Sequence, residues 1–209
     1  MSVSSTTSWT SRNVTVESDQ FVAKWLFSVA MLVALMVVIG GVTRLTGSGL
    51  SMVEWRPLMG TLPPMTAVEW QRVYELYQAS PEYQQLNYGM SLSKFKTIFF
   101  WEYLHRLMGR LIGLVFFLPM VFLWFRGHLV GKQRMRATVA LVLGGTQGLL
   151  GWYMVKSGLV NNPEVSQYRL AAHLSLAFSV FGLAWWMMLS LRSGQTPPRN
   201  PRARWVRPW

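Results

Sequence analysis

Residues 99–113 read FFWEYLHRLMGRLIG and lie inside an otherwise apolar run from Thr97 to Phe125. At about 1.5 Å per residue, a helix of that length is more than long enough to cross a bilayer. The ionisable side chains of the run are Glu102, His105, Arg106 and Arg110. Such groups are costly in hydrocarbon, so they must face protein, water or a ligand.

The polar positions of this helix share one side. At about 100° per residue, Glu102, His105, Arg106, Gly109 and Gly113 fall within an arc of about 100°. One side of the helix is therefore apolar, and the other carries a carboxylate, an imidazole, a guanidinium and two positions without a side chain. We take this face as the candidate functional centre.

The composition is that of a membrane protein. The chain has 209 residues, of which 51% are hydrophobic and only 13% are charged. Segments of membrane-spanning length are Trp25–Thr43, Thr97–Phe125, Ala137–Val155 and Leu170–Leu191. We predict an all-α, polytopic membrane protein whose bundle of four transmembrane helices occupies residues 23–192.

The basic residues indicate topology rather than nucleic-acid binding. The net charge is +12, and Lys and Arg are concentrated in the short loop 126–136 and in the tail 193–209. The positive-inside rule then places this loop and both termini on the cytoplasmic side. No basic stripe alternates with exposed aromatic residues, which argues against a nucleic-acid partner. The absence of cysteine excludes disulfides and thiolate metal sites.

The segments outside the spans differ in character. Residues 1–22 are predicted to be a disordered inner tail, and 193–209 a basic tail rich in Pro and Arg. The outer loop 44–96 is predicted to be partly helical, because Thr66 and Glu69 form a capping box that opens a helix and Pro81 must end it. We interpret this long loop as a lid over a site near the outer surface rather than a plain connector.

Two features of the third span concern packing. Gly144 and Gly148 form a small-xxx-small pair, which we interpret as a surface for close helix contact. Gln147 lies between them, and an amide in this setting needs a hydrogen-bond partner.

Two of the three histidines lie in the outer parts of spans that run in the same direction. His105 is about 12 Å inward of Thr97 and His173 about 5 Å inward of Leu170 along their helices. Two imidazoles at one depth on two helices are what axial ligation of a heme iron requires. Gly109 and Ala177 lie one turn inward of the two histidines and would leave room for a flat ring. The alternative is that each histidine bonds a neighbour and only joins helices.

The charged neighbours of His105 also have two interpretations. Arg106 either pairs with Glu102 at i,i+4 or, with Arg110, binds heme propionates. Glu102 is either a structural ion-pair partner or a catalytic group that moves protons or stabilises a developing cation. The sequence leaves both questions open.

Several stretches resemble one family. The Glu102-x-x-His105-Arg106 pattern is similar to the signature of the heme A synthase family, in its cysteine-free alphaproteobacterial and mitochondrial form. The resemblance covers roughly residues 22–191. It is carried further by residues 40–46, 87–91, 151–158 and 166–173.

This resemblance implies an enzyme that oxidises a methyl group of heme O to the formyl group of heme A, for cytochrome oxidase assembly. It implies that the substrate heme lies between His105 and His173, and that Glu102 is the catalytic residue. From their spacing and charge, and not from the resemblance, we take Arg106, Arg110, Gly109 and Ala177 as candidate heme-binding residues. It implies a multi-pass protein of the bacterial inner membrane, or alternatively of the mitochondrial inner membrane. Heme O and the lipid bilayer are the implied partners, and a homo-oligomer, heme O synthase and a redox partner are left open.

The family has eight helices in two similar four-helix bundles, the second of which holds heme b. This chain has four predicted spans, so we expect a truncated form that corresponds to the N-terminal half and lacks the heme b site. Whether such a short chain turns over by itself is left open.

A second hypothesis is a non-catalytic heme-binding or electron-transfer membrane protein of the cytochrome b type. It needs His105 and His173 but not Glu102. The hemes extracted with the protein distinguish the two, because only the synthase carries heme O or heme A. A purely structural membrane bundle is disfavoured by the charged face of the second span.

Overall fold

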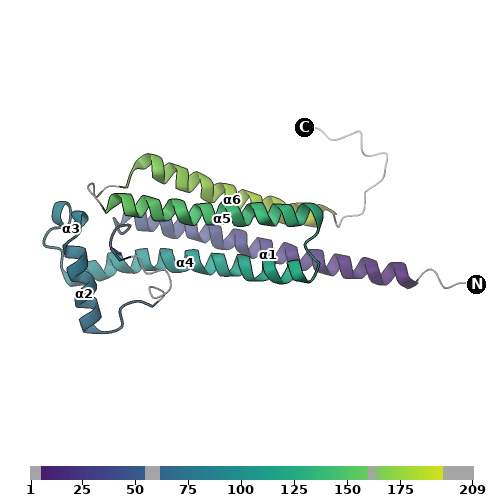
Figure 1. The fold of residues 1–209 in the computed structure, drawn as a ribbon, viewed down its shortest axis with the longest axis horizontal. Coiled ribbons are helices and arrows are strands. Elements are labelled where there is room, and N and C mark those ends of the chain that lie inside the picture. The colour runs from purple at the N-terminus through teal and green to yellow at the C-terminus, as the bar shows by residue number, and fades with distance from the viewer. Residues whose placement is uncertain (1–5, 55–61, 160–162, 164, 195–209) are drawn as a thin grey trace, which may run out of the picture.

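The computed structural model describes residues 6–54, 62–159, 163 and 165–194 (Figure 1). Helices account for most of these residues, and no strand occurs among them. The helices are α1 Thr6–Leu45, α2 Ala67–Gln78, α3 Pro81–Gln85, α4 Leu92–Phe125, α5 Gly131–Gly158 and α6 Gln167–Gly194. The all-α prediction is confirmed.

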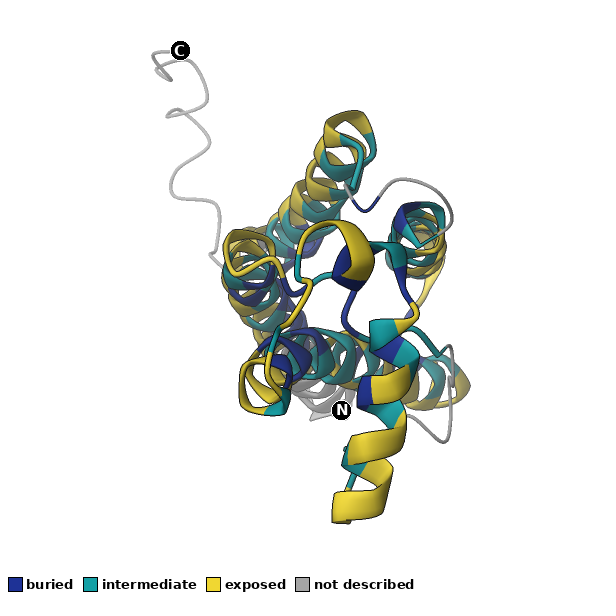
Figure 2. Cartoon of the chain, turned by 90° about the vertical axis from the view of Figure 1, so that its left-hand side faces the viewer, coloured by how far each residue is buried: buried dark blue, intermediate teal, exposed yellow. Residues whose placement is uncertain are grey.

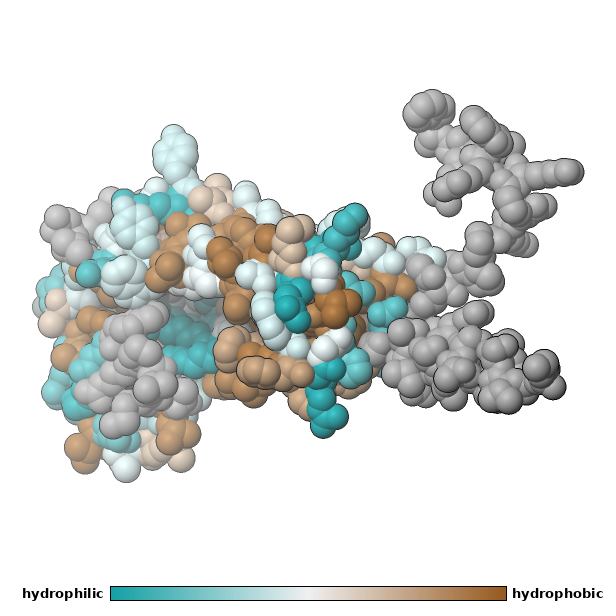
Figure 3. Space-filling view, turned by 45° about the vertical axis from the view of Figure 1, so that its right-hand side comes forward, coloured by the Kyte–Doolittle hydropathy of each residue, from teal (hydrophilic) through white to brown (hydrophobic). Residues whose placement is uncertain are grey.

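Four of these helices are long and apolar enough to cross a membrane. The candidate spans are Asp19–Leu45, Leu92–Phe125, Gly131–Gly158 and Gln167–Ser193. Each contains one predicted span, and all but Leu92–Phe125, which ends at the predicted Phe125, extend beyond it at both ends. The four helices lie side by side in Figure 1, and hydrophobic side chains cover the middle of the bundle in Figure 3. This surface is the kind that lipid covers.

The N-terminal prediction was wrong over the described residues. We expected no regular structure over 1–22, but α1 is helical from Thr6 onward. A helix already nucleated by an apolar span extends cheaply, because each added residue gains one hydrogen bond without a new nucleus. Polar residues can therefore continue the span into water. Residues 1–5, and all of the predicted tail after Gly194, lie outside the described residues.

The inner half of the bundle is a filled apolar core. Here α1 lies between α4 and α6 and contacts both extensively. The most deeply buried side chains include Val22, Leu26, Leu123 and Met188. The indole of Trp25 donates a hydrogen bond to the Val115 carbonyl at 2.8 Å. The described core of this half is apolar. The ionisable side chains of α4 therefore lie toward the outer end of the bundle.

The outer end, at the left of Figure 1, carries the predicted helical loop. Thr66 and Glu69 form the capping box of α2, and Ser80 caps α3 with Pro81 as its first residue. An aromatic cluster joins these helices to α4, with Tyr77 stacked on Phe95 at a centroid distance of 4.9 Å. Figure 2 views the bundle from this end. The outer segment is therefore docked on the bundle by its aromatic side chains.

The small-xxx-small prediction was wrong for this chain as described. A Cβ atom at Gly144 or Gly148 would meet no described atom within 4 Å. The reason is that α5 packs mainly against α6 through other residues, and these two glycine positions face open space.

Candidate functional site

Glu102 is the buried centre of the polar face of α4. Only 2% of this residue is exposed. Its Oε2 accepts hydrogen bonds from the Ser51 hydroxyl and from the Met52 backbone N–H, each at 2.7 Å. The loop that follows α1 therefore covers the carboxylate and supplies two of its donors.

That loop is held in a fixed shape by its own small polar residues. Thr46 and Ser48 share a hydrogen bond of 2.6 Å between their hydroxyls, and the Ser51 backbone N–H donates to the Ser48 carbonyl at 3.4 Å. Gly47 has φ of 63°, a conformation that favours glycine. These contacts orient Ser51 and Met52 toward Glu102 before any ligand binds.

Arg106 completes the shell around the carboxylate. Its Nη2 group donates to Glu102 Oε1 and also to the Met52 carbonyl, at 3.1 Å. The ion pair is largely buried, with 13% of the Arg106 side chain and 3% of the Glu102 side chain exposed. Donors on both carboxylate oxygens compensate for burying its charge. Of the two interpretations of Arg106, the pairing with Glu102 is present in the structure.

The two histidines of interest pack against glycines of neighbouring helices. A Cβ atom at Gly40 of α1 would lie 3.3 Å from Nε2 of His105. A Cβ atom at Gly151 of α5 would lie 3.0 Å from Cε1 of His173. The two imidazoles are close enough to interact electrostatically. The structure thus brings His105 and His173 together, each in a space that a glycine keeps open.

Gln147 and His173 form a pair with unused hydrogen-bonding capacity. Nε2 of Gln147 lies 3.2 Å from Nε2 of His173, so the predicted need of this amide for a partner is met. Oε1 of Gln147 and Nδ1 of His173 are buried without a hydrogen-bond partner among the described residues. Buried polar atoms are rarely left in this state, and these two point to a group that the site would receive.

The donor set suits a heme iron better than a bare metal ion. In the described ranges no three His, Cys, Asp or Glu side chains come together as a metal site. A heme iron takes four ligands from the porphyrin and needs only two from the protein, which two histidines can supply. Gly109 has open space apart from the Met36 methyl group, and Ala177 and Arg110 are half-buried. The residues present therefore fit a heme.

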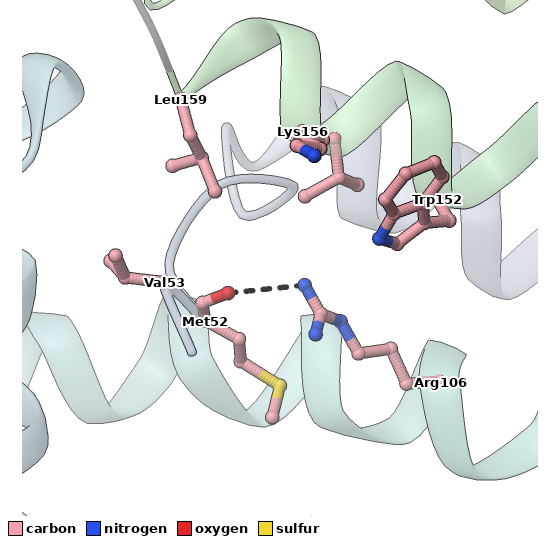
Figure 4. A pocket seen from close by; sticks show the side chains of 7 residues that line it. Met52, Val53, Arg106, Trp152, Lys156 and Leu159 are labelled. Carbon is pink, nitrogen blue, oxygen red and sulfur yellow. Dashed lines mark hydrogen bonds between the residues drawn. The ribbon is translucent and has the colours of Figure 1, made fainter. Parts of the chain in front are cut away.

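A cavity of about 320 Å³ lies between α4, α5 and the loop after α1 (Figure 4). Arg106 reaches it from α4, and Trp152 and Lys156 line it from the facing helix (Figure 4). Its other lining residues are apolar: Met52, Val53, Val155 and Leu159.

Sequence reasoning missed three parts of this site. Gly40 and Gly151 were noted only within the stretches 40–46 and 151–158, and were not predicted to lie against the histidines. Ser51 and the Met52 N–H were not recognised as partners of Glu102, because a loop that folds back on a helix leaves no periodic signal. A glycine on a neighbouring helix, at the depth of a histidine, is the signal that could have predicted these contacts.

Comparison with known proteins identifies the family of the chain. The family model COX15-CtaA, described as "Cytochrome oxidase assembly protein", matches residues 23–209. The chain belongs to the COX15-CtaA family.

Relatives of this COX15-CtaA chain carry the name "Heme A synthase". The protein from Nitrosospira multiformis is 52% identical over 170 residues, which are 81% of this chain and 48% of the relative. Those from Parvibaculum lavamentivorans and Maricaulis maris are 54% and 50% identical, over 84% and 87% of this chain and 51% and 53% of their own length. The chain thus spans about half the length of these relatives. No solved structure matches it.

Proposed function

We propose that this COX15-CtaA chain acts in heme A synthesis, by binding heme O and oxidising one of its methyl groups to a formyl group. The observation that carries the proposal is a buried carboxylate, Glu102, one helical turn from a histidine that lies near a second histidine. Relatives at 50% to 54% identity are named for the same activity.

In this proposal His105 and His173 are the axial ligands of the iron of the substrate. His173 has one ring nitrogen without a partner, and the other shares its contact with a side-chain amide that can rotate away. Gly109, Ala177 and Arg110 would line the porphyrin. Heme O would supply the iron and the reacting methyl group.

Glu102 has the chemistry to act beside the reacting carbon. With water as the source of oxygen, conversion of a methyl to a formyl group adds one oxygen atom and releases the hydrogens as protons and electrons. A carboxylate close to the porphyrin edge would accept a proton or stabilise a developing positive charge. Ser51, Met52 and Arg106 fix its position, so little reorganisation is needed during the reaction. The electrons would pass to a redox partner.

We propose the bacterial plasma membrane as the location, with both termini in the cytoplasm. The basic loop 126–136 supports this orientation. Glu102 and the two histidines would then lie in the outer leaflet, beneath α2 and α3. The mitochondrial inner membrane is the alternative.

The test is expression of the chain beside a source of heme O, followed by chromatography of the hemes that co-purify. Wild type is expected to carry heme O and heme A. Glu102→Gln is expected to keep heme O but to lose at least about a hundredfold in heme A, as for removal of a group that acts in proton transfer. Undiminished heme A from Glu102→Gln would remove this residue from the mechanism.

One observation favours a second candidate function. Glu102 has donors on both of its oxygens, which is also what a purely structural ion pair would show. A non-catalytic bis-histidine heme protein would then remain. In the same chromatography it would yield only heme that the cell already contains in other proteins, and no heme A from heme O.

A further inference from the structure

The cavity between α4 and α5 carries more positive than negative charge. Arg106 is paired with Glu102, but no described acidic side chain lies within salt-bridge distance of Lys156. The ammonium of Lys156 lies 4.8 Å from the centroid of the Trp152 ring, which holds it at the cavity wall. The net charge here is therefore +1, because the one negative side chain, Glu102, is outnumbered by the two positive ones, Arg106 and Lys156.

The cavity is placed to meet the edge of a ligand bound between the histidines. Arg106 directly follows His105 in α4. Lys156 follows Gly151, the residue against the His173 ring, by five positions, or about 7.5 Å along the helix. The Arg106 guanidinium turns back from there to the Met52 carbonyl, so both cations reach the cavity, from opposite helices (Figure 4).

The size and lining of the cavity indicate which kind of ligand group it can bind. Its volume of about 320 Å³ is at the lower limit for pockets that enclose a whole small molecule, so it suits part of a larger one. Val155, Leu159 and Val53 provide an apolar wall, and the cations provide the polar end. An anion at the end of a short hydrocarbon chain matches this combination.

We propose that Lys156, with Arg106, binds the carboxylate side chains of the heme substrate and so sets which edge of the porphyrin faces outward. This inference rests on the proposed function and goes beyond it, because it assigns Lys156 as a substrate-binding residue. The opposite edge of the porphyrin is then directed toward the bundle interior, and the orientation decides which ring substituents come near Glu102.

The test compares ferric heme with its dimethyl ester, in which both carboxylates are neutral. Wild type, Lys156→Met and Lys156→Gln are purified in detergent and titrated with each probe, and binding is followed by the heme absorption band. Wild type is expected to bind the diacid about tenfold more tightly than the diester, as for a charge-assisted contact. Both variants should lose most of this preference, because they bind the diacid more weakly and the diester as before. Lys156→Arg, which keeps the positive charge, should keep the preference.

Lys132→Met is the matched control, because Lys132 is an exposed lysine at the opposite end of the same helix. It should leave both affinities unchanged. Equal weakening of diacid and diester by both Lys156 variants would mean that Lys156 supports the fold, and would overturn the inference. An unchanged preference would overturn it as well. Failure of the wild type to bind either probe would overturn the proposed function together with this inference.

Discussion

At the scale of single residues, two glycines decide whether the histidines fit. Gly40 and Gly151 lie against the rings of His105 and His173, at distances where a methyl group would press on the imidazole. Gly144, Gly145 and Gly148, also on α5, face open space. Identical residues in one helix therefore have different roles, and only their neighbours distinguish them.

Gly151→Ala is expected to displace the His173 ring and to weaken heme binding about tenfold or more. The added Cβ atom would lie 3.0 Å from Cε1 of His173, and the ring must move by a few tenths of an ångström to accept it. Gly148→Ala, whose Cβ meets nothing within 4 Å, is the control and should gain up to about 1 kcal/mol of helix stability. Heme titration and thermal unfolding measure the two effects. Equal heme affinity in both variants would contradict the assigned role of Gly151.

Some of the residue-level site could be predicted from the sequence, and some could not. The one-face arrangement of Glu102, His105 and Arg106 follows from helical periodicity, and the structure keeps it. The donors on Glu102 Oε2 come from residues about fifty positions away, in a loop with no periodic pattern. Long-range contacts of this kind depend on how the loop folds, which spacing does not reveal.

At the scale of elements, the outer segment is an ordered layer with one unusual group. Capping signals predicted the start of α2, because a capping box is local chemistry. Glu82 of α3 was not foreseen. It is 6% exposed, and its Oε2 has no hydrogen-bond partner among the described residues.

Burial raises the pKa of Glu82 from 4.5 to about 7, and the charge of Glu102 adds to the rise, whereas a hydrogen bond from Tyr77 opposes it. The folded form holds this proton more tightly than the unfolded form. The stabilisation of the fold by protonated Glu82 is therefore fully present below pH 4.5 and is lost as the pH rises through 7. The loss amounts to about 3 kcal/mol at most.

Glu82→Gln should therefore stabilise the outer segment at pH 8 and have almost no effect at pH 4. Hydrogen exchange of the α2 and α3 amides, compared with wild type at each pH, measures this difference. Glu75→Gln is the control, because Glu75 is exposed on α2. Equal protection of wild type and Glu82→Gln at pH 8 would show that Glu82 carries no such cost.

At the scale of the whole molecule, the bundle is divided into an apolar inner half and a polar outer half. The four spans were predictable because a membrane requires long apolar helices. The length of α1 could not be predicted. Its polar N-terminal part has no helical pattern of its own and is helical because it continues the span. The division places every group proposed for chemistry under α2 and α3, where the outer segment covers the end of the bundle.

The most direct test of the account is the low-spin heme spectrum of the purified chain loaded with heme. We expect wild type to show the reduced and oxidised bands of a bis-histidine heme. His105→Ala and His173→Ala should each abolish them, whereas His128→Ala, in the loop between α4 and α5, should keep them. Low-spin bands that survive in both His105→Ala and His173→Ala, or that are absent from wild type, would contradict a heme held between these two residues.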